Sequence, residues 1–433
     1  MSQPIYALVD CNNFFVSCLR AFRPDLEEVP VVALSSNDGC VVARSNEARA
    51  LGIPMGAPAF KWREFFDKHK VVAFSGNFEL YGDMSRRVTS ILTTVTPRIE
   101  LYSIDESFLD ISGLPIEDIS AWGREVQTKV RQWTGIPVSV GVAPTKTLAK
   151  LASERGKRSA ELNGVLDLYS DPAVRRQYME GTKLEDVWGV GRRLSPRLRG
   201  EGIANAWDLS QMNLRYAQQI MGIQGRRMVS ELNGLSCYAL EKFGKPQQSI
   251  SVTRTFGNDT AKLHVLESAI ATFTTKAAFR LREGKQLAGS AGLFIATNQH
   301  KPGFNMRSRK VDFDLATADT GRIAEALMSL LKDMFNPKAE YHRAGVWLGD
   351  LRPRTNLQVD LLGSIDPDLH DKSQRSMAAL DNLNERYGKR TVHYAAEDLD
   401  QTTWQPRHKI GMPRFTTRWD EIPKVAIAKQ PAD

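Results

Sequence analysis

The sequence has little cysteine and no long apolar run. Its 433 residues include four cysteines, Cys11, Cys18, Cys40 and Cys237. They show no metal-type spacing, so free thiols in a reducing compartment are favoured over a disulfide scaffold. No stretch approaches the roughly 20 apolar residues of a membrane span, and the first residues lack a basic segment followed by an apolar one. These absences argue against secreted and membrane proteins, and we expect a cytoplasmic protein with no membrane partner.

Positive charge is concentrated in the middle of the chain. The net charge is +8, and the sequence divides into 19 basic and 20 acidic side chains in residues 1–170, 27 and 18 in 171–352, and 12 and 12 in 353–433. A local excess of nine positive charges suggests a surface for a polyanion such as nucleic acid. On composition alone, a generally basic protein is an equally good interpretation.

The pattern of apolar residues predicts several domains of mixed α and β structure. Strands are expected at Ile5–Asp10, Val31–Leu34, Leu101–Ile111 (a pair) and Val138–Ala143, with helices at Asp83–Thr94 and Ile119–Trp133. Short Gly-punctuated helices follow at Leu184–Val187, Arg192–Arg199, Ala206–Met212 and Gly225–Leu232. The sequence thus indicates an α+β unit followed by a small helical one.

A second α+β domain is expected after the Gly- and Pro-containing stretch Phe243–Pro246. Its strands are predicted at Ser249–Phe256, Ala291–Thr297, Lys310–Asp314 and Ala344–Leu348, and its helices at Leu263–Glu283 and Thr320–Phe335, in the order β-α-β-β-α-β. The last eighty or so residues are polar and broken by Pro and Gly, with one helix near Ser373–Tyr387. We expect partner binding there rather than chemistry.

Three acidic residues stand at predicted strand ends. Asp10 ends an apolar strand, and Asp105 and Glu106 lie where a hairpin would turn. Three such carboxylates could hold two divalent ions for in-line nucleotidyl or phosphoryl transfer, and Mg²⁺ suits hard oxygen ligands and phosphate substrates. Taken singly, each acid is more often an ordinary turn or cap residue.

The sequence segments around these acids resemble the signature motifs of the Y family of DNA polymerases. The resemblance is strongest to the UmuC-type branch, which includes the catalytic subunit of bacterial DNA polymerase V. Tyr6–Phe15 resembles the first motif of the family, and Ser103–Asp110 resembles the second. Val42–Gly56 is similar to the finger segment and Gly141–Lys157 to the last palm motif. The matches run in order over residues 5–350, which is more specific than any single motif.

The resemblance implies a multidomain α+β right-hand polymerase. It predicts a palm over residues 1–32 and 75–170, fingers over 33–74, a helix-hairpin-helix thumb over 171–243, a β-α-β-β-α-β little finger over 244–352 and a C-terminal UmuC-type extension over 353–433. The implied activity is low-fidelity, template-directed DNA synthesis past damaged bases, that is, translesion synthesis in SOS mutagenesis. Its implied cofactor is a pair of Mg²⁺ ions.

The same resemblance assigns roles in the active site. It makes Asp10, Asp105 and Glu106 the catalytic metal ligands, with the carbonyl of Cys11 as another. Nucleotide contacts would come from the backbone N–H groups of Phe14 and Phe15 and from the side chains of Arg49 and Lys157. Phe15 would also be the steric gate, because a ring beneath the sugar collides with a ribose 2′-OH. The sequence departs from the family at Asn46, where a phosphate-binding tyrosine is common, and at Asn12, where many relatives have an acid.

Contacts with DNA are expected from the thumb and the little finger. Gly189, Gly191 and Arg192 lie in a segment similar to a helix-hairpin-helix turn, which binds backbone phosphate without reading sequence. A helix C-cap explains the two glycines equally well. A second candidate turn spans Met221–Arg227. In the strand resembling the start of the little finger, Arg254 would meet phosphate.

The expected partners follow from the same family. They are primer-template DNA, deoxynucleoside triphosphates, a sliding clamp, a UmuD-type accessory subunit and a recombinase filament. Gln358, Leu361 and Leu362 resemble a clamp-binding peptide, although an edge strand of the little finger fits the spacing as well. Two competing functions remain: a two-metal nuclease or phosphotransferase using the same acids, and a non-catalytic DNA-binding relative.

Overall fold

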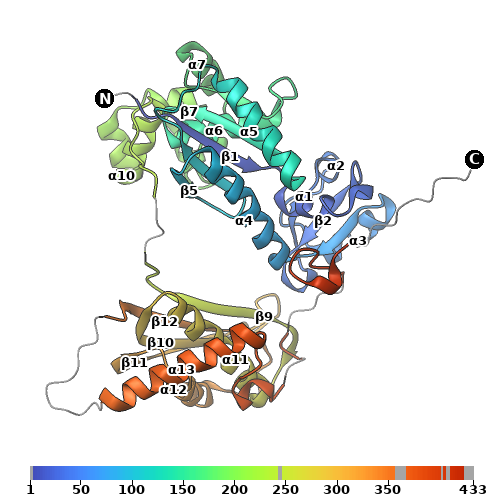
Figure 1. Ribbon diagram of the computed structural model, residues 1–433, viewed down its shortest axis with the longest axis vertical. Helices are drawn as coiled ribbons and strands as arrows, with labels where there is room; N and C mark the ends of the chain where they lie inside the picture. Colours follow the sequence, from blue (N-terminus) through green and yellow to red (C-terminus); the bar gives the residue numbers. More distant parts are fainter. Residues whose placement is uncertain (1–2, 242–245, 356–366, 401–402, 406–409, 424–433) are drawn as a thin grey trace, which may run out of the picture. The chain divides into compact units, whose positions relative to one another are not determined.

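The computed structural model describes residues 3–241, 246–355, 367–400, 403–405 and 410–423 (Figure 1). The chain forms two units. Unit 1 comprises Met1–Ser35, Gly39–Gly244 and Ile410–Asp433, and unit 2 comprises Ser36–Asp38 and Lys245–Lys409. The chain therefore leaves unit 1 for unit 2 and returns to it near its C-terminal end.

A five-stranded sheet forms the centre of unit 1. Its order is β5-β6-β1-β7-β8, with β5 at Ile99–Leu101, β6 at Glu106–Asp110, β1 at Tyr6–Cys11, β7 at Val138–Ala143 and β8 at Val165–Asp167. Side chains alternate between its faces. Ala7 and Val9 pack with α1 (Phe14–Arg20), α4 (Phe78–Val95) and α5 (Ile119–Thr134), whereas Tyr6 and Leu8 pack on the other face with α6 (Lys146–Arg158).

Helix α6 lies directly against β7 because residue 141 is glycine. A Cβ at Gly141 would stand 2.2 Å from the backbone nitrogen of Ser153 and 2.3 Å from the carbonyl oxygen of Ala149. Any side chain there would push the helix off the sheet. This close approach fixes the height of α6 above the strands that carry the acidic residues.

A smaller sheet holds the segment that resembles the fingers. Its order is β3-β2-β4, with β2 (Val31–Leu34) antiparallel to β3 (Val41–Arg44) and parallel to β4 (Val72–Ser75). It packs with α2 (Asn46–Ala50) and α3 (Ala59–Lys68) around its own apolar core. In the chain, the short 3-10 turn η1 (Pro24–Leu26) precedes β2, and the turn η2 (Ser36–Asp38) that follows β2 is counted with unit 2. The expected strand at Val31–Leu34 is confirmed.

The predicted small helical region is present. It contains α7 (Pro172–Glu180), the 3-10 turn η3 (Leu184–Asp186), α8 (Leu194–Gly200), α9 (Ala206–Ser210) and α10 (Leu214–Leu232). Leu198, Leu209 and Val229 share a core with Tyr6 and Leu8, so these helices pack on the palm-like sheet. Helix α10 is broken at Gly222, which has φ 70°, within the second predicted turn segment.

Unit 2 has the predicted β-α-β-β-α-β order. The elements are β9 (Ile250–Thr260), α11 (Leu263–Glu283), β10 (Gln286–Thr297), β11 (Met306–Thr317), α12 (Thr320–Met334) and β12 (Tyr341–Pro353). The sheet order is β11-β10-β12-β9, and α11 and α12 pack with it in a single core. The strands run several residues longer than predicted, because polar ends of a strand extend the hydrogen-bond ladder without changing the apolar pattern.

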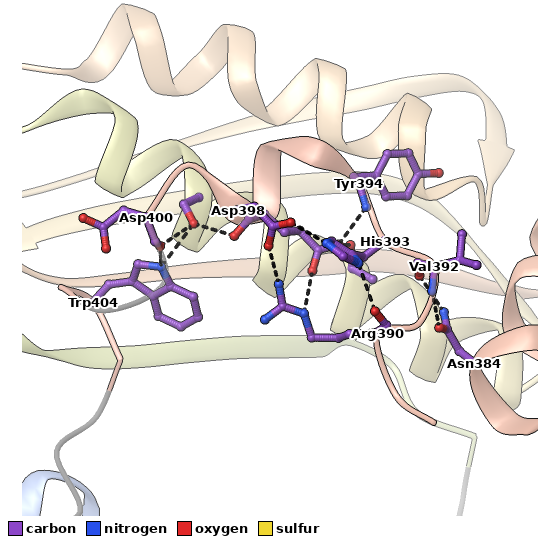
Figure 2. A network of polar contacts seen from close by, with 11 residues as sticks. Asn384, Arg390, Val392, His393, Tyr394, Asp398, Asp400 and Trp404 are labelled. Atoms are coloured by element: carbon purple, nitrogen blue, oxygen red, sulfur yellow. Dashed lines mark hydrogen bonds and ion pairs between the residues drawn. The ribbon is translucent and has the colours of Figure 1, made fainter. Parts of the chain in front are cut away.

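The described parts of the C-terminal extension are divided between the two units. Helix α13 (Pro367–Tyr387), longer than expected, is tied to α11 by the ion pair of Asp381 with Arg282, at 2.6 Å. The network that follows is shown in Figure 2, where Arg390 and His393 meet Asp398, and the carbonyl of Asp400 accepts from the indole of Trp404 at 2.6 Å. Trp404 is buried in the core of unit 2, and η4 (Ala395–Asp398) lies against α11. Residues 410–423, which include η5 (Trp419–Glu421), belong to unit 1.

Among the described residues, no helix is both long and apolar enough to cross a membrane.

Candidate active site at the edge of the palm-like sheet

Asp10 and Glu106 face each other on neighbouring strands. They are paired in the antiparallel register of β1 and β6, which places their side chains on the same face of the sheet. The backbone N–H of Cys11 donates to the carbonyl of Asp105 at 2.9 Å and so fixes the point where the hairpin meets β1. Asp10 is buried and Glu106 is half-buried.

Helix α6 brings three lysines to the acids of the sheet. Lys157 forms an ion pair with Asp10, Lys150 with Glu106, and Lys146 with Glu100 at 2.6 Å. The spacings of four and seven residues put the three lysines on one face of the helix. The partners lie on β1, β6 and β5, which are adjacent in the sheet.

Burial and neighbouring acids raise the pKa of Asp10. Burial raises the pKa of Asp10 to about 7, the charges of Glu106 and Asp105 push it in the same direction, and Lys157 opposes them. Burial alone would lower the pKa of Lys157, but Asp10, Glu154 and Glu106 raise it above its ordinary value. Asp10 therefore lies in a partly desolvated environment with other acids nearby, where its charged form depends on a cation such as Lys157.

The third predicted acid, Asp105, directly precedes β6. Asp105 is half-buried and its carboxylate accepts a hydrogen bond from the hydroxyl of Ser103 at 2.5 Å. No three His, Cys, Asp or Glu side chains come together as a possible metal site in the part of the chain that the structure describes. Burial raises the pKa of the Cys11 thiol far above its usual range, so only the carbonyl of this residue is a suitable hard ligand.

Phe14 and Phe15 begin helix α1 at the end of the turn after β1. Asn13, in the left-handed region at φ 49°, turns the chain into the helix, and the first N–H groups of a helix have no intrahelical acceptor. Phe14 is buried. Phe15 is half-buried, and its ring stacks on Tyr81 with centroids 4.2 Å apart and planes 15° apart.

Arg49 lies on the exposed side of α2. It has no ion pair or hydrogen bond from its side chain among the described residues, so its charge is available to a ligand. Nearby, the side chain of Asn46 accepts a hydrogen bond from Asn13 at 3.3 Å, which links the fingers to the turn before α1. The structure does not bring Arg49 into contact with Lys157.

The predicted thumb turn lies between η3 and α8. Gly189 has φ 95°, and a Cβ there would meet the methyl group of Met228 at 2.7 Å, so glycine is required. Gly191 and Arg192 are exposed. The indole of Trp188 in this turn donates to the hydroxyl of Tyr102 at 3.2 Å, and the ammonium of Lys150 lies 5.1 Å from the ring centroid of Tyr102.

Unit 2 carries a cluster of cations at Arg254. Arg254 is exposed on β9. Burial and the nearby charges of Arg254, Arg390 and Arg280 lower the pKa of Lys276. Because like charges repel unless an anion neutralises them, this cluster suits phosphate.

Sequence reasoning missed the contact of Lys150 with Glu106. The predicted clamp-binding residues cannot be placed in the structure. Lys150 lies within Gly141–Lys157, the segment that resembles the last palm motif, and its spacing of seven from Lys157 is the available signal for a shared helix face. Its partner Glu106 could not be inferred without the tertiary contact. Gln358, Leu361 and Leu362 lie outside the described residues.

Two solved polymerase structures share this fold. A Y-family DNA polymerase chimera matches with a TM-score of 0.65 at 21% identity, covering 81% of this chain and 99% of its own. DinB from Sulfolobus solfataricus matches with a TM-score of 0.51 at 22% identity, covering 80% and 98%. The fold is that of the Y-family DNA polymerases, which confirms the expected fold class.

Sequence comparison defines the family more narrowly. Residues 9–154 match the impB/mucB/samB family, 247–361 its C-terminal domain, and 374–425 a domain of unknown function (DUF4113). UmuC of Salmonella typhimurium is 38% identical over 97% of this chain and 100% of its own, and MucB of Escherichia coli is 34% identical over 98% and 100%. The chain belongs to the impB/mucB/samB family, and its predicted place in the UmuC-type branch is confirmed.

Proposed function

We propose that this protein is a DNA-directed DNA polymerase that copies past damaged bases with low fidelity and serves SOS mutagenesis. Family membership and fold support a template-directed nucleotidyl transferase. The observation that carries the assignment of the active site is the pairing of Asp10 with Glu106 across β1 and β6, with Asp105 at the adjoining turn. These residues are our candidates for the catalytic acids.

The residues fit a pair of Mg²⁺ ions by their chemistry. Carboxylates and a backbone carbonyl are hard oxygen donors. Burial raises the pKa of Asp10 to about 7 even beside Lys157, so a bound cation would further stabilise its charged form. We assign Asp10, Asp105, Glu106 and the carbonyl of Cys11 as ligands. When bound, the ions would activate the primer 3′-hydroxyl and stabilise the leaving pyrophosphate.

The remaining residues would bind the incoming nucleotide. We assign Arg49 as a fork for phosphate oxygens and Lys157 as a point charge that could move from Asp10 to the triphosphate. The backbone N–H groups of Phe14 and Phe15 would donate hydrogen bonds to further phosphate oxygens. The ring of Phe15, backed by Tyr81, would exclude a ribose 2′-OH.

DNA would be held by phosphate contacts without sequence reading. Gly189 and Gly191 allow close approach of the backbone, and Arg192 supplies charge. In unit 2, Arg254 and the cations around it would meet further phosphates. Such contacts suit an enzyme that must accept any template, including a damaged one.

Three partners are proposed from the family resemblance. A sliding clamp would bind Gln358, Leu361 and Leu362 as an extended peptide, with the leucines in an apolar pocket. A UmuD-type accessory subunit and a recombinase filament would complete the active assembly.

Primer extension and nuclease assays on the same labelled DNA distinguish the competing functions. We expect Mg²⁺-dependent extension of the primer opposite an abasic site and no shortening of either strand. Shortening without extension would establish the nuclease. DNA binding with neither reaction, with and without accessory proteins, would indicate a non-catalytic relative.

A further inference from the structure

A short C-terminal segment, Ile410–Phe415, is bonded to the core of unit 1, and we call it the strap. The carbonyl of Ile410 accepts from the backbone N–H of Ser75 at 3.1 Å, and its own N–H donates to the hydroxyl of Ser75 at 3.3 Å. The side-chain amide of Asn77 donates to the carbonyl of Pro413 at 3.0 Å. These bonds hold the backbone of the strap to the end of β4 and the start of α4.

An aromatic anchor ends the strap. Phe415 is buried, and its ring stacks on Phe22 with centroids 4.8 Å apart and planes 5° apart. Arg414 also pairs with Glu79 at 2.6 Å, but both side chains are almost half exposed, so this pair adds little. The buried ring is therefore the main source of binding energy for the strap.

Between these attachments, Met412 lines the same small cavity as Phe15, the proposed steric gate. It is half-buried, and together with Phe15, Leu80 and Tyr81 it lines a cavity of about 10 Å³. Such a space holds at most about one water molecule. Tyr81 stacks on the ring of Phe15, and the ring of Phe78 is roughly perpendicular to it with centroids 6.2 Å apart. The ring of Phe15 therefore has little room to move.

We propose that the strap positions Phe15 and thereby sets how strictly the polymerase excludes ribonucleotides. The inference rests on the proposed function, because the strap can affect sugar selection only if Phe15 is the steric gate of a polymerase. It also gives a role to part of the segment that matches a domain of unknown function, residues 374–425. Met412 is a positioning residue in this account, because it lines the cavity beside Phe15 and would act on the nucleotide only through that ring.

The test is single-nucleotide incorporation by the full-length chain, with the ratio of kcat/KM for a deoxynucleotide to that for the matching ribonucleotide as readout. Met412→Ala leaves space into which the ring can move, and we expect the ratio to fall about tenfold, at the low end for one altered apolar contact. Deoxynucleotide kcat should stay within about twofold of wild type. Met412→Leu, which conserves volume, should keep the wild-type ratio.

Met179→Ala is the matched control, because Met179 is buried in the core on the other face of the palm-like sheet. An unchanged ratio for Met412→Ala, or an equal fall for Met179→Ala, would overturn the inference. If Met412→Ala does not fold, Phe415→Ala, which removes the anchor, is judged by the same criterion. Phe15→Ala distinguishes failure of the strap inference from failure of the steric-gate assignment. If Phe15→Ala loses sugar discrimination and Met412→Ala does not, only the strap inference is refuted. If Phe15→Ala keeps its discrimination, the steric-gate assignment itself is refuted.

Discussion

Lys157 on α6 forms an ion pair with Asp10 at the end of β1, so one candidate phosphate ligand is bound to one candidate metal ligand. Lys150 on the same helix forms an ion pair with Glu106, a second candidate metal ligand. The pairing gives the buried carboxylates partial compensation when neither metal nor nucleotide is bound. Loading the site would require both lysines to release the acids, and Lys157 would then be free for the triphosphate.

The raised pKa of Asp10 predicts a pH-dependent stability. An acid whose pKa is raised by folding, here from 3.8 to about 7, stabilises the fold fully below about pH 4, and this contribution is lost as the pH rises through 7. Without Mg²⁺, the Tm of wild type should therefore fall relative to that of Asp10→Asn between pH 5 and pH 7 and then level off. A Tm difference that does not change over this range would contradict the assignment.

Phe15→Ala should admit ribonucleotides. Removing the ring removes the collision with the 2′-OH without touching a metal ligand, and incorporation of a ribonucleotide opposite an undamaged base should rise relative to the deoxynucleotide. Phe15→Tyr keeps the ring and serves as the control. Unchanged discrimination in the alanine variant means that another residue selects the sugar.

The exposed arginines of the thumb turn should bind DNA through phosphates. Replacing Arg192 and Arg193 by Ala should weaken binding equally for all sequences, and the slope of log K against log salt should shrink by about 1.8. Arg199→Ala is the control, because Arg199 is held by Glu185 at 2.8 Å. The control removes one positive charge and the test change removes two. A change in slope half as large with Arg199→Ala would therefore show that net charge matters and the turn does not.

The clamp peptide is predicted from the sequence alone. Leu361→Ala with Leu362→Ala should reduce clamp pull-down and processivity on clamp-loaded DNA, while distributive synthesis on bare primer stays at the wild-type rate. If the double variant melts at lower temperature and also loses activity on bare DNA, the leucines belong to a folded core.

Local patterns and motifs predicted much of the fold, while long-range pairings remained hidden. The alternation of valine with small residues predicted β7 with its observed bounds, Val138–Ala143, and all six of its residues are buried. The pairing of Lys150 with Glu106 joins residues far apart in sequence, and nothing in either segment specifies it. Phe415 is one aromatic residue in a polar stretch without periodicity, so its burial was not foreseen.

The most direct test of the central claim is primer extension by Asp105→Asn compared with wild type, with Mg²⁺ present and with DNA affinity measured in parallel. The amide has no charge to hold a metal ion, yet the thumb and unit 2 keep their phosphate contacts. We predict that nucleotide addition is abolished while the Kd for primer-template DNA stays within about twofold of wild type. Extension by the variant at the wild-type rate would contradict the two-metal site at these three acids.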